Sequence, residues 1–133
     1  MSFDALEMSL TTLELVAPLE AKVRLRRKSL ADEIGRAAES IALNTSEARA
    51  RAGLDRADLF RRAAGSASEL TTALRIARAR GYITAQDHTA VDAMLDRVRA
   101  MLCSMASQCT SCRARDCATG SARLTSRLST AVR

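Results

Sequence analysis

The stretch of sequence that decides the fold is VDAMLDRVRAMLCSM, residues 91–105. Its apolar residues recur at alternating steps of four and three, at Val91, Leu95, Val98, Leu102 and Met105. This spacing places them on one face of a helix, as in the seam between packed helices. The stretch therefore predicts an amphipathic helix that is buried along one side.

Three more helices are predicted before this one, and Gly, Pro and capping residues mark their ends. Pro18 lacks a backbone donor and should kink or end the first helix. Ser29 is a good N-cap for the second helix, and Gly53 is a plausible stop for it. Gly81 should end the third helix as a left-handed cap, and Thr84 should cap the fourth.

Composition and connection lengths favour a helical bundle. Aromatic residues make up only 2% of the chain, and there is one Pro and five Gly in 133 residues, which leaves little material for strands and turns. The short connections at 53–55 and 81–84 require the helices that they join to be antiparallel. We predict an all-α, antiparallel up-and-down four-helix bundle over residues 1–108. Residues 109–133 are rich in Ser, Thr and Arg without an apolar face, and we expect a disordered basic tail.

The formal charge of +6 is unevenly distributed, which suggests an anionic partner such as nucleic acid. Because aromatic side chains for base stacking are scarce, binding should be directed to the phosphate backbone and sensitive to salt. The alternative is a solvated basic surface that only keeps the protein in solution. The predicted nucleic-acid contacts form two runs in the sequence: Lys22, Arg24, Arg26, Arg27 and Lys28, then Arg49, Arg51, Arg56, Arg61 and Arg62.

Two groups of small and polar residues predict helix–helix or subunit contacts. Ser40, Asn44 and Glu47 recur at steps of four and three, so they share one side of a helix and could fix its register or bridge subunits. Gly65 and Ser66 lie in a helix, where Gly is unfavourable by about 1 kcal/mol relative to Ala. A close approach of another helix would explain them, either within the chain or from another subunit.

No residue pattern indicates catalysis or a cofactor, and the Cys-x2-Cys pair of Cys109 and Cys112 provides only half of the ligands of a structural zinc site. The sequence has no Gly-rich phosphate loop and no nucleophile beside a base, so we expect a protein that is not an enzyme. The single His, His88, is expected to be exposed in the first turn of its helix. Free thiols are expected in preference to a metal site for the four cysteines, Cys103, Cys109, Cys112 and Cys117.

The cysteines also bear on location. They are confined to 103–117, so they cannot link distant parts of a fold, which suggests a reducing, cytoplasmic setting. The start MSFDALEM is acidic, unlike a secretory signal, and no run approaches the roughly 18 apolar residues that a membrane span needs.

Three blocks in the middle of the chain carry a resemblance to a known family. RAAESIALNTSE contains Arg36, Ala37, Ser40, Ile41, Asn44 and Glu47; GSASEL contains Gly65, Ser66, Glu69 and Leu70; and GYI is Gly81, Tyr82 and Ile83. Their order and spacing over residues 29–105 resemble the four-helix-bundle family first recognised in proteins encoded by intervening sequences of large-subunit ribosomal RNA genes. That family also includes the accessory variability determinant of diversity-generating retroelements.

The resemblance implies a bundle that assembles as a ring-shaped homopentamer. In the retroelement relatives the ring is basic and associates with a reverse transcriptase and nucleic acid, so RNA or DNA and possibly such an enzyme are the partners that it implies. The alternative is a bundle that binds only proteins. Ala48 stands where the family often has Gly, and the tail lies outside the resemblance.

Overall fold

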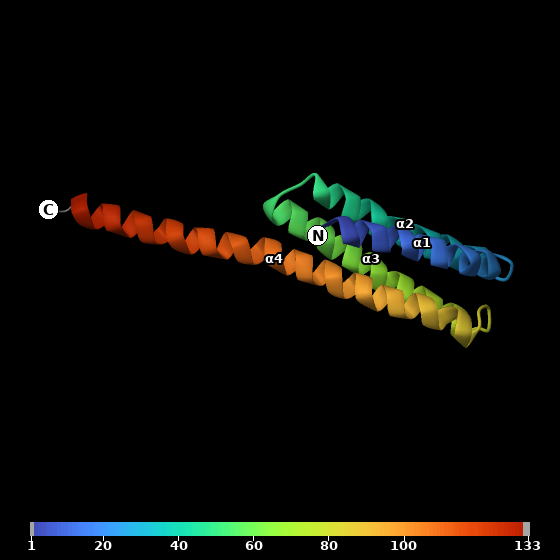
Figure 1. Ribbon diagram of the computed structural model, residues 1–133. Coiled ribbons are helices and arrows are strands. Elements are labelled where there is room, and N and C mark those ends of the chain that lie inside the picture. The colour runs from blue at the N-terminus through green and yellow to red at the C-terminus, as the bar shows by residue number, and fades with distance from the viewer. Residues whose placement is uncertain (1, 132–133) are drawn as a thin grey trace.

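The computed structural model contains four helices that pack in sequence order (Figure 1). They are α1 (Ser2–Arg24), α2 (Lys28–Arg49), α3 (Gly53–Ala79) and α4 (Ala85–Ala131). The structure describes the backbone of residues 2–131 and the side chains of residues 5–110. Each helix packs against the next, and α1 also lies against α4. The predicted all-α four-helix bundle is confirmed.

The predicted tail, residues 109–133, falls almost wholly outside the described side chains. The backbone of α4 is helical to Ala131, beyond the end that the loss of apolar periodicity predicts near residue 108. The division of the chain at residue 108 and the disorder of the tail stay predictions.

The core consists of small and aliphatic side chains. Phe60 is the largest fully buried side chain, and it is accompanied by Ile34, Ile41, Leu70 and Leu74. Many of the remaining buried positions are Ala, which lets neighbouring helices approach closely. Of the predicted seam on α4, the first four residues are almost fully buried and Met105 is half-buried.

The connection between α3 and α4 follows its local signals. Gly81 adopts φ +76°. Its N–H and that of Tyr82 donate to the carbonyls of Arg78 and Ala77, at 3.0 and 2.9 Å, which is a Schellman stop. Thr84 and Asp87 then exchange hydrogen bonds of 3.1 Å between side chain and backbone. This reciprocal cap confirms the predicted start of α4.

The other predicted boundaries differ from the structure. α1 continues through Pro18, whose exposed position lets water solvate the carbonyl that loses its partner. α2 begins at Lys28 with Arg27 as its N-cap, so Ser29 lies inside the helix and does not cap it. α2 ends at Arg49, and Gly53, with φ +63°, is the first residue of α3 instead of the stop of α2.

Candidate nucleic-acid interface

Two segments far apart in the sequence meet at one end of the bundle. Residues 20–32 comprise the α1–α2 connection and the adjoining turns of both helices, and residues 75–88 comprise the α3–α4 connection and its adjoining turns. The Lys22 ammonium lies 2.9 Å from the Asp87 carboxylate. The Arg26 guanidinium lies 5.5 Å from the centre of the Tyr82 ring, a cation–π contact. We call these two segments the basic end.

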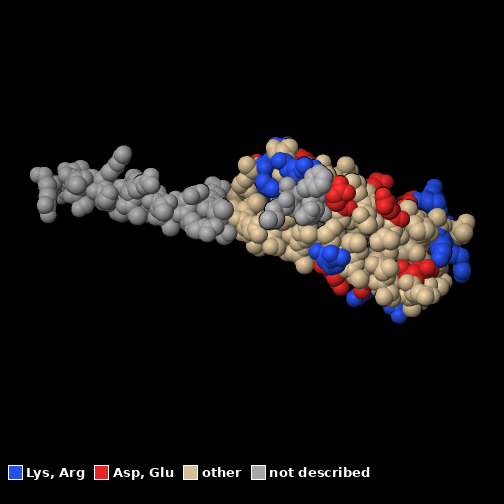
Figure 2. All heavy atoms as spheres, viewed as in Figure 1, with Lys and Arg blue, Asp and Glu red and all other residues tan. Residues whose placement is uncertain are grey.

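The basic end has a large excess of positive charge. It contains eight Lys and Arg residues and three carboxylates, a net charge of +5. Figure 2 shows Lys and Arg gathered at this end of the bundle, opposite the C-terminal end of α4. Within the described residues, six of the bases make no ion pair: Arg26, Arg27, Lys28, Arg75, Arg78 and Arg80.

The three carboxylates at the basic end are already paired. Arg24 binds Asp32 at 2.8 Å and Glu20 at 3.0 Å. These two bonds raise the pKa of Arg24. The ion pair from Lys22, followed by the hydrogen bonds from Thr84, lowers the pKa of Asp87. None of the three carboxylates is therefore left to neutralise the remaining bases, which are exposed.

The N-terminus of α2 adds to this positive potential. No side chain caps it, and its first turn contains no acidic residue. Arg27 and Lys28 occupy the N-cap and the first helical position, where the helix dipole favours negative charge. Several backbone N–H groups at this terminus lack a helical acceptor and can donate to an anion.

The second predicted basic run lies at the opposite end of the bundle. The 22 residues of α2 separate the two ends by about 33 Å. Arg51 pairs with Glu47 at 3.3 Å, and Arg62 pairs with Asp58 at 3.0 Å. The remaining predicted contacts at this end are Arg49, Arg56 and Arg61.

Charge is more nearly balanced at this opposite end. Residues 47–62 contain five Arg and three acids, a net charge of +2. The Arg56 guanidinium lies 5.5 Å from the centre of the Phe60 ring, and its Nε is buried without a hydrogen-bond partner among the described atoms. The ten predicted contacts are therefore two separate surfaces of unequal charge.

Arg78 and Arg80 are missing from the predicted contact set, although they belong to the basic end. They precede Gly81 at the end of α3, more than fifty residues after Arg26 in the sequence. The antiparallel arrangement brings both segments together. The predicted topology, applied to every helix end, would have found them.

A polar bridge joins α2 and α3. The Ser40 and Ser66 hydroxyls lie 2.8 Å apart, and the Asn44 amide donates to the Ser40 hydroxyl at 3.0 Å and to its carbonyl at 2.9 Å. Glu47, which shares their side of the helix in the sequence pattern, instead pairs with Arg51. The bridge can fix the register of the two helices, but it provides no acid–base pair.

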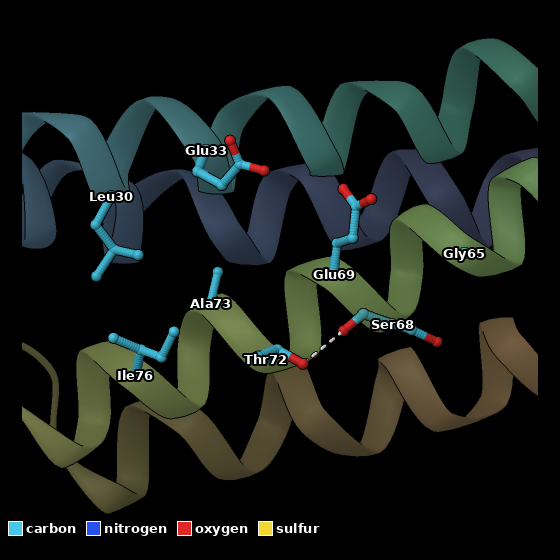
Figure 3. A pocket seen from close by; sticks show the side chains of 8 residues that line it. All are labelled: Leu30, Glu33, Gly65, Ser68, Glu69, Thr72, Ala73 and Ile76. Carbon is cyan, nitrogen blue, oxygen red and sulfur yellow. Dashed lines mark hydrogen bonds between the residues drawn. The ribbon is translucent and has the colours of Figure 1, made fainter.

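Gly65 faces a shallow groove of about 430 Å³ along α2 and α3 (Figure 3). A Cβ atom at Gly65 would meet nothing within 4 Å, so no helix of this chain approaches it closely. Leu30 and Ile76 face each other at one end of the groove, and Ile76 is 44% exposed. Within the chain, close packing does not explain Gly65, because the residue borders open space.

Glu33 and Glu69 line the same groove from α2 and α3. Arg36 bridges them, since it binds Glu33 and also lies 2.9 Å from Glu69. The hydrogen bond from Arg36 lowers the pKa of Glu33. Because Arg36 offsets one of the two carboxylate charges, the groove has only a small net negative charge.

His88 is buried, and the prediction of an exposed residue is wrong. Its exposed fraction is 5%. His88 precedes Val91 by three residues, so it lies on the seam that α4 presents to the bundle. It also lines a pocket of about 510 Å³ together with Arg75, Arg78 and Asp92.

Cys103 is exposed, Cys109 is half-buried, and both are free thiols. The side chains of Cys112 and Cys117 lie outside the described residues. Among the side chains that are described, no cluster of three His, Cys, Asp or Glu is arranged to hold a metal ion. In the same part of the chain, no helix has both the length and the apolar character that a membrane crossing requires.

Comparisons with known proteins agree with this architecture. A family model described as "23S rRNA-intervening sequence protein" matches residues 4–104. A crystal structure at 1.70 Å of a protein of unknown function from the S23 ribosomal protein family of Bacteroides thetaiotaomicron superposes with a TM-score of 0.72. The two chains are 20% identical over 77% of this chain and 97% of the other, a likeness that concerns the fold. No curated protein matches.

Proposed function

Since the chain belongs to the 23S rRNA-intervening sequence protein family, we propose that it is a non-enzymatic, homo-oligomeric scaffold that binds nucleic acid through its basic end. The observation that carries this proposal is the net charge of +5 on two adjoining segments whose carboxylates are already paired. Such a surface attracts a polyanion, and Arg has the planar set of donors that suits phosphate.

The uncapped start of α2 supports the same conclusion. A helix N-terminus is normally stabilised by a capping side chain or by acids in its first turn, whereas α2 has Arg27 and Lys28 there. These residues lower the stability of the helix, but they place two cations beside free backbone N–H groups. A phosphate at this position would accept hydrogen bonds from the N–H groups and neutralise the cations.

The contact should be salt-dependent and weakly selective for sequence. If the six bases without an ion pair each neutralise one phosphate of a duplex, the plot of log affinity against log salt has a slope of about −5.4. A fourfold rise in salt then weakens binding roughly 1,800-fold.

The groove along α2 and α3 is the surface that we assign to self-association. Gly65 leaves room for an approaching helix, and the side chains of Leu30 and Ile76 provide apolar area. Copies packed in this way would repeat the basic end in every subunit and add their potentials. A pentamer and a reverse-transcriptase partner, which the family resemblance implies, stay predictions.

The test compares two triple variants in binding titrations with RNA and duplex DNA. Replacement of Arg27, Lys28 and Arg80 by Ala should reduce the magnitude of the salt slope by about 3. A matched variant with Ala at Arg51, Arg61 and Arg62 removes as many charges from the opposite end and should change the slope much less. Equal losses in the two variants, or no binding by the wild type at low salt, would refute the proposal.

Light scattering on the same samples tests the oligomer. The wild type should have the mass of several chains. If the wild type has the mass of a single chain, the proposed homo-oligomer is refuted. The titrations then still test nucleic-acid binding at the basic end.

A further inference from the structure

A pocket of about 510 Å³ lies between the end of α3 and the start of α4, next to the basic end. Arg75 and Arg78 line it from α3, and His88, Asp92 and Asp96 line it from α4. Its size is within the range of small-ligand sites in proteins. It therefore combines a cationic wall with a wall that carries two carboxylates.

The Arg side chains that line this pocket form no ion pairs with its Asp side chains. Neither Arg75 nor Arg78 makes an ion pair with the described residues. Asp96 pairs with Arg99 on its own helix, and Asp92 Oδ1 lies 3.9 Å from His88 Nε2. Because exposed ion pairs contribute little to stability, Arg75 and Arg78 stay unpaired at little cost and are available to a ligand.

His88 provides an independent observation, because a buried ring nitrogen of its side chain lacks a hydrogen-bond partner. Its side chain is 94% buried, and its Nε2 has no hydrogen-bond partner among the described atoms. A buried polar atom without a partner is unfavourable, and 3.9 Å to Asp92 Oδ1 is too long for a hydrogen bond. A small side-chain shift that opens Nε2 to the pocket would let one hydroxyl oxygen lie about 2.8 Å from both atoms and satisfy both of them.

We propose that this pocket binds one ribonucleotide unit, with its phosphate on Arg75 and Arg78 and its 2′-hydroxyl donating to Asp92 beside His88. The inference rests on the proposed nucleic-acid binding and specifies RNA as the ligand. A site for phosphate alone would not place a carboxylate on the facing wall, because that carboxylate repels the anion. The 2′-hydroxyl is a donor that RNA has and DNA lacks, so Asp92 can distinguish the two.

The first experiment compares RNA, DNA and 2′-O-methyl RNA of one single-stranded sequence on the wild-type chain. RNA makes one hydrogen bond to Asp92 that DNA cannot make, so RNA should bind about five- to tenfold more tightly than DNA. The 2′-O-methyl RNA keeps the oxygen but loses the donated proton, so it should bind like DNA. Equal affinity for RNA and DNA would overturn the inference.

The second experiment uses Asp92→Ala, with Asp58→Ala as a control that removes a carboxylate from the opposite end. Ala removes the acceptor, so Asp92→Ala should weaken RNA binding to the level of DNA and leave DNA binding unchanged or slightly tighter. The control should keep the preference for RNA. If Asp92→Ala instead tightens RNA and DNA by the same factor, the carboxylate only repels phosphate and the inference is wrong.

The two proposals fail in different ways. Suppose that the triple variant of Arg27, Lys28 and Arg80 loses binding while the wild type shows no preference for RNA: nucleic-acid binding at the basic end is then supported, and the ribonucleotide pocket is refuted. Suppose instead that the wild type prefers RNA and the triple variant binds like the wild type: the pocket is then supported, and binding at the basic end is refuted.

Discussion

Arg27→Asp is expected to stabilise the fold and weaken nucleic-acid binding at the same time. Arg27 is the N-cap of α2, with an extended backbone at φ −154° and ψ 102°, and no side chain caps the helix. A capping Asp would accept a hydrogen bond from a free N–H in the first turn, worth about 1 kcal/mol. Replacing a cation by an anion at the helix N-terminus adds about 0.5 kcal/mol. Among the described residues, the side-chain hydrogen bond that the change removes joins Arg27 to Ser29 at 3.3 Å on the exposed surface.

The expected rise in the free energy of unfolding is therefore about 1–1.5 kcal/mol, which raises Tm by about 3–6 °C in a domain of this size. Chemical and thermal unfolding measure this gain. In a binding titration at low salt, RNA affinity should fall, and the magnitude of the salt slope should decrease by about 1, because one phosphate contact is lost.

Arg61→Asp is the matched control. It makes the same change of charge at an exposed position inside α3, far from a helix start. It should lower stability slightly, since Asp is a poorer helix former than Arg, and it should leave RNA affinity nearly unchanged. The reasoning fails if Arg27→Asp lowers the stability, or if it stabilises the chain and leaves RNA binding intact.

Three further substitutions test the fold. At a protein concentration where the chain is monomeric, Gly65→Ala should raise the free energy of unfolding by up to about 1 kcal/mol, because within one chain its Cβ meets open space. Gly35→Ala should gain less, since its Cβ would lie 2.9 Å from the Glu20 carboxylate. Urea titration that ranks the two the other way would contradict this. Phe60→Ala should lower stability by about 3–5 kcal/mol in the same assay, and a loss below 1 kcal/mol would show that this part of the core is misplaced. Asp87→Asn should lower stability at pH 7, and its deficit should vanish as the pH falls through the lowered pKa of Asp87, below the ordinary 3.8; a deficit independent of pH would exclude the ion pair as its cause.

The sequence predicts the fold well where the signals are local. The alternating steps of four and three from Val91 identify the buried face of α4, and Gly81 and Thr84 mark the two sides of the α3–α4 connection correctly. These features depend on residues a few positions apart, so one segment is enough to recognise them.

The predictions that differ from the structure concern residues whose surroundings come from other helices. α1 does not end at Pro18, since Leu19 and Val23 beyond it are buried in the core and hold the helix together; the other predicted effect, a kink, stays a prediction. His88 is buried because α4 presents it to the bundle one step before the apolar seam begins. A seam traced one step upstream from Val91 would have included it.

The candidate site is the least predictable part. Arg26 and Arg80 belong to one surface only because α3 runs antiparallel to α2, and the two predicted basic runs separate because α2 lies between them. The missing cap at Arg27 is equally hidden, since Ser29 two residues later is the better capping residue by type. Composition indicates an anionic partner, but the location of the surface requires the three-dimensional arrangement.

The most direct measurement is to cross-link bound RNA to the wild-type protein and identify the modified peptides by mass spectrometry. The account predicts that the cross-links concentrate in residues 20–32 and 75–88, with few in residues 47–62. Cross-links that concentrate in residues 47–62, or that spread evenly over all basic segments, would contradict it.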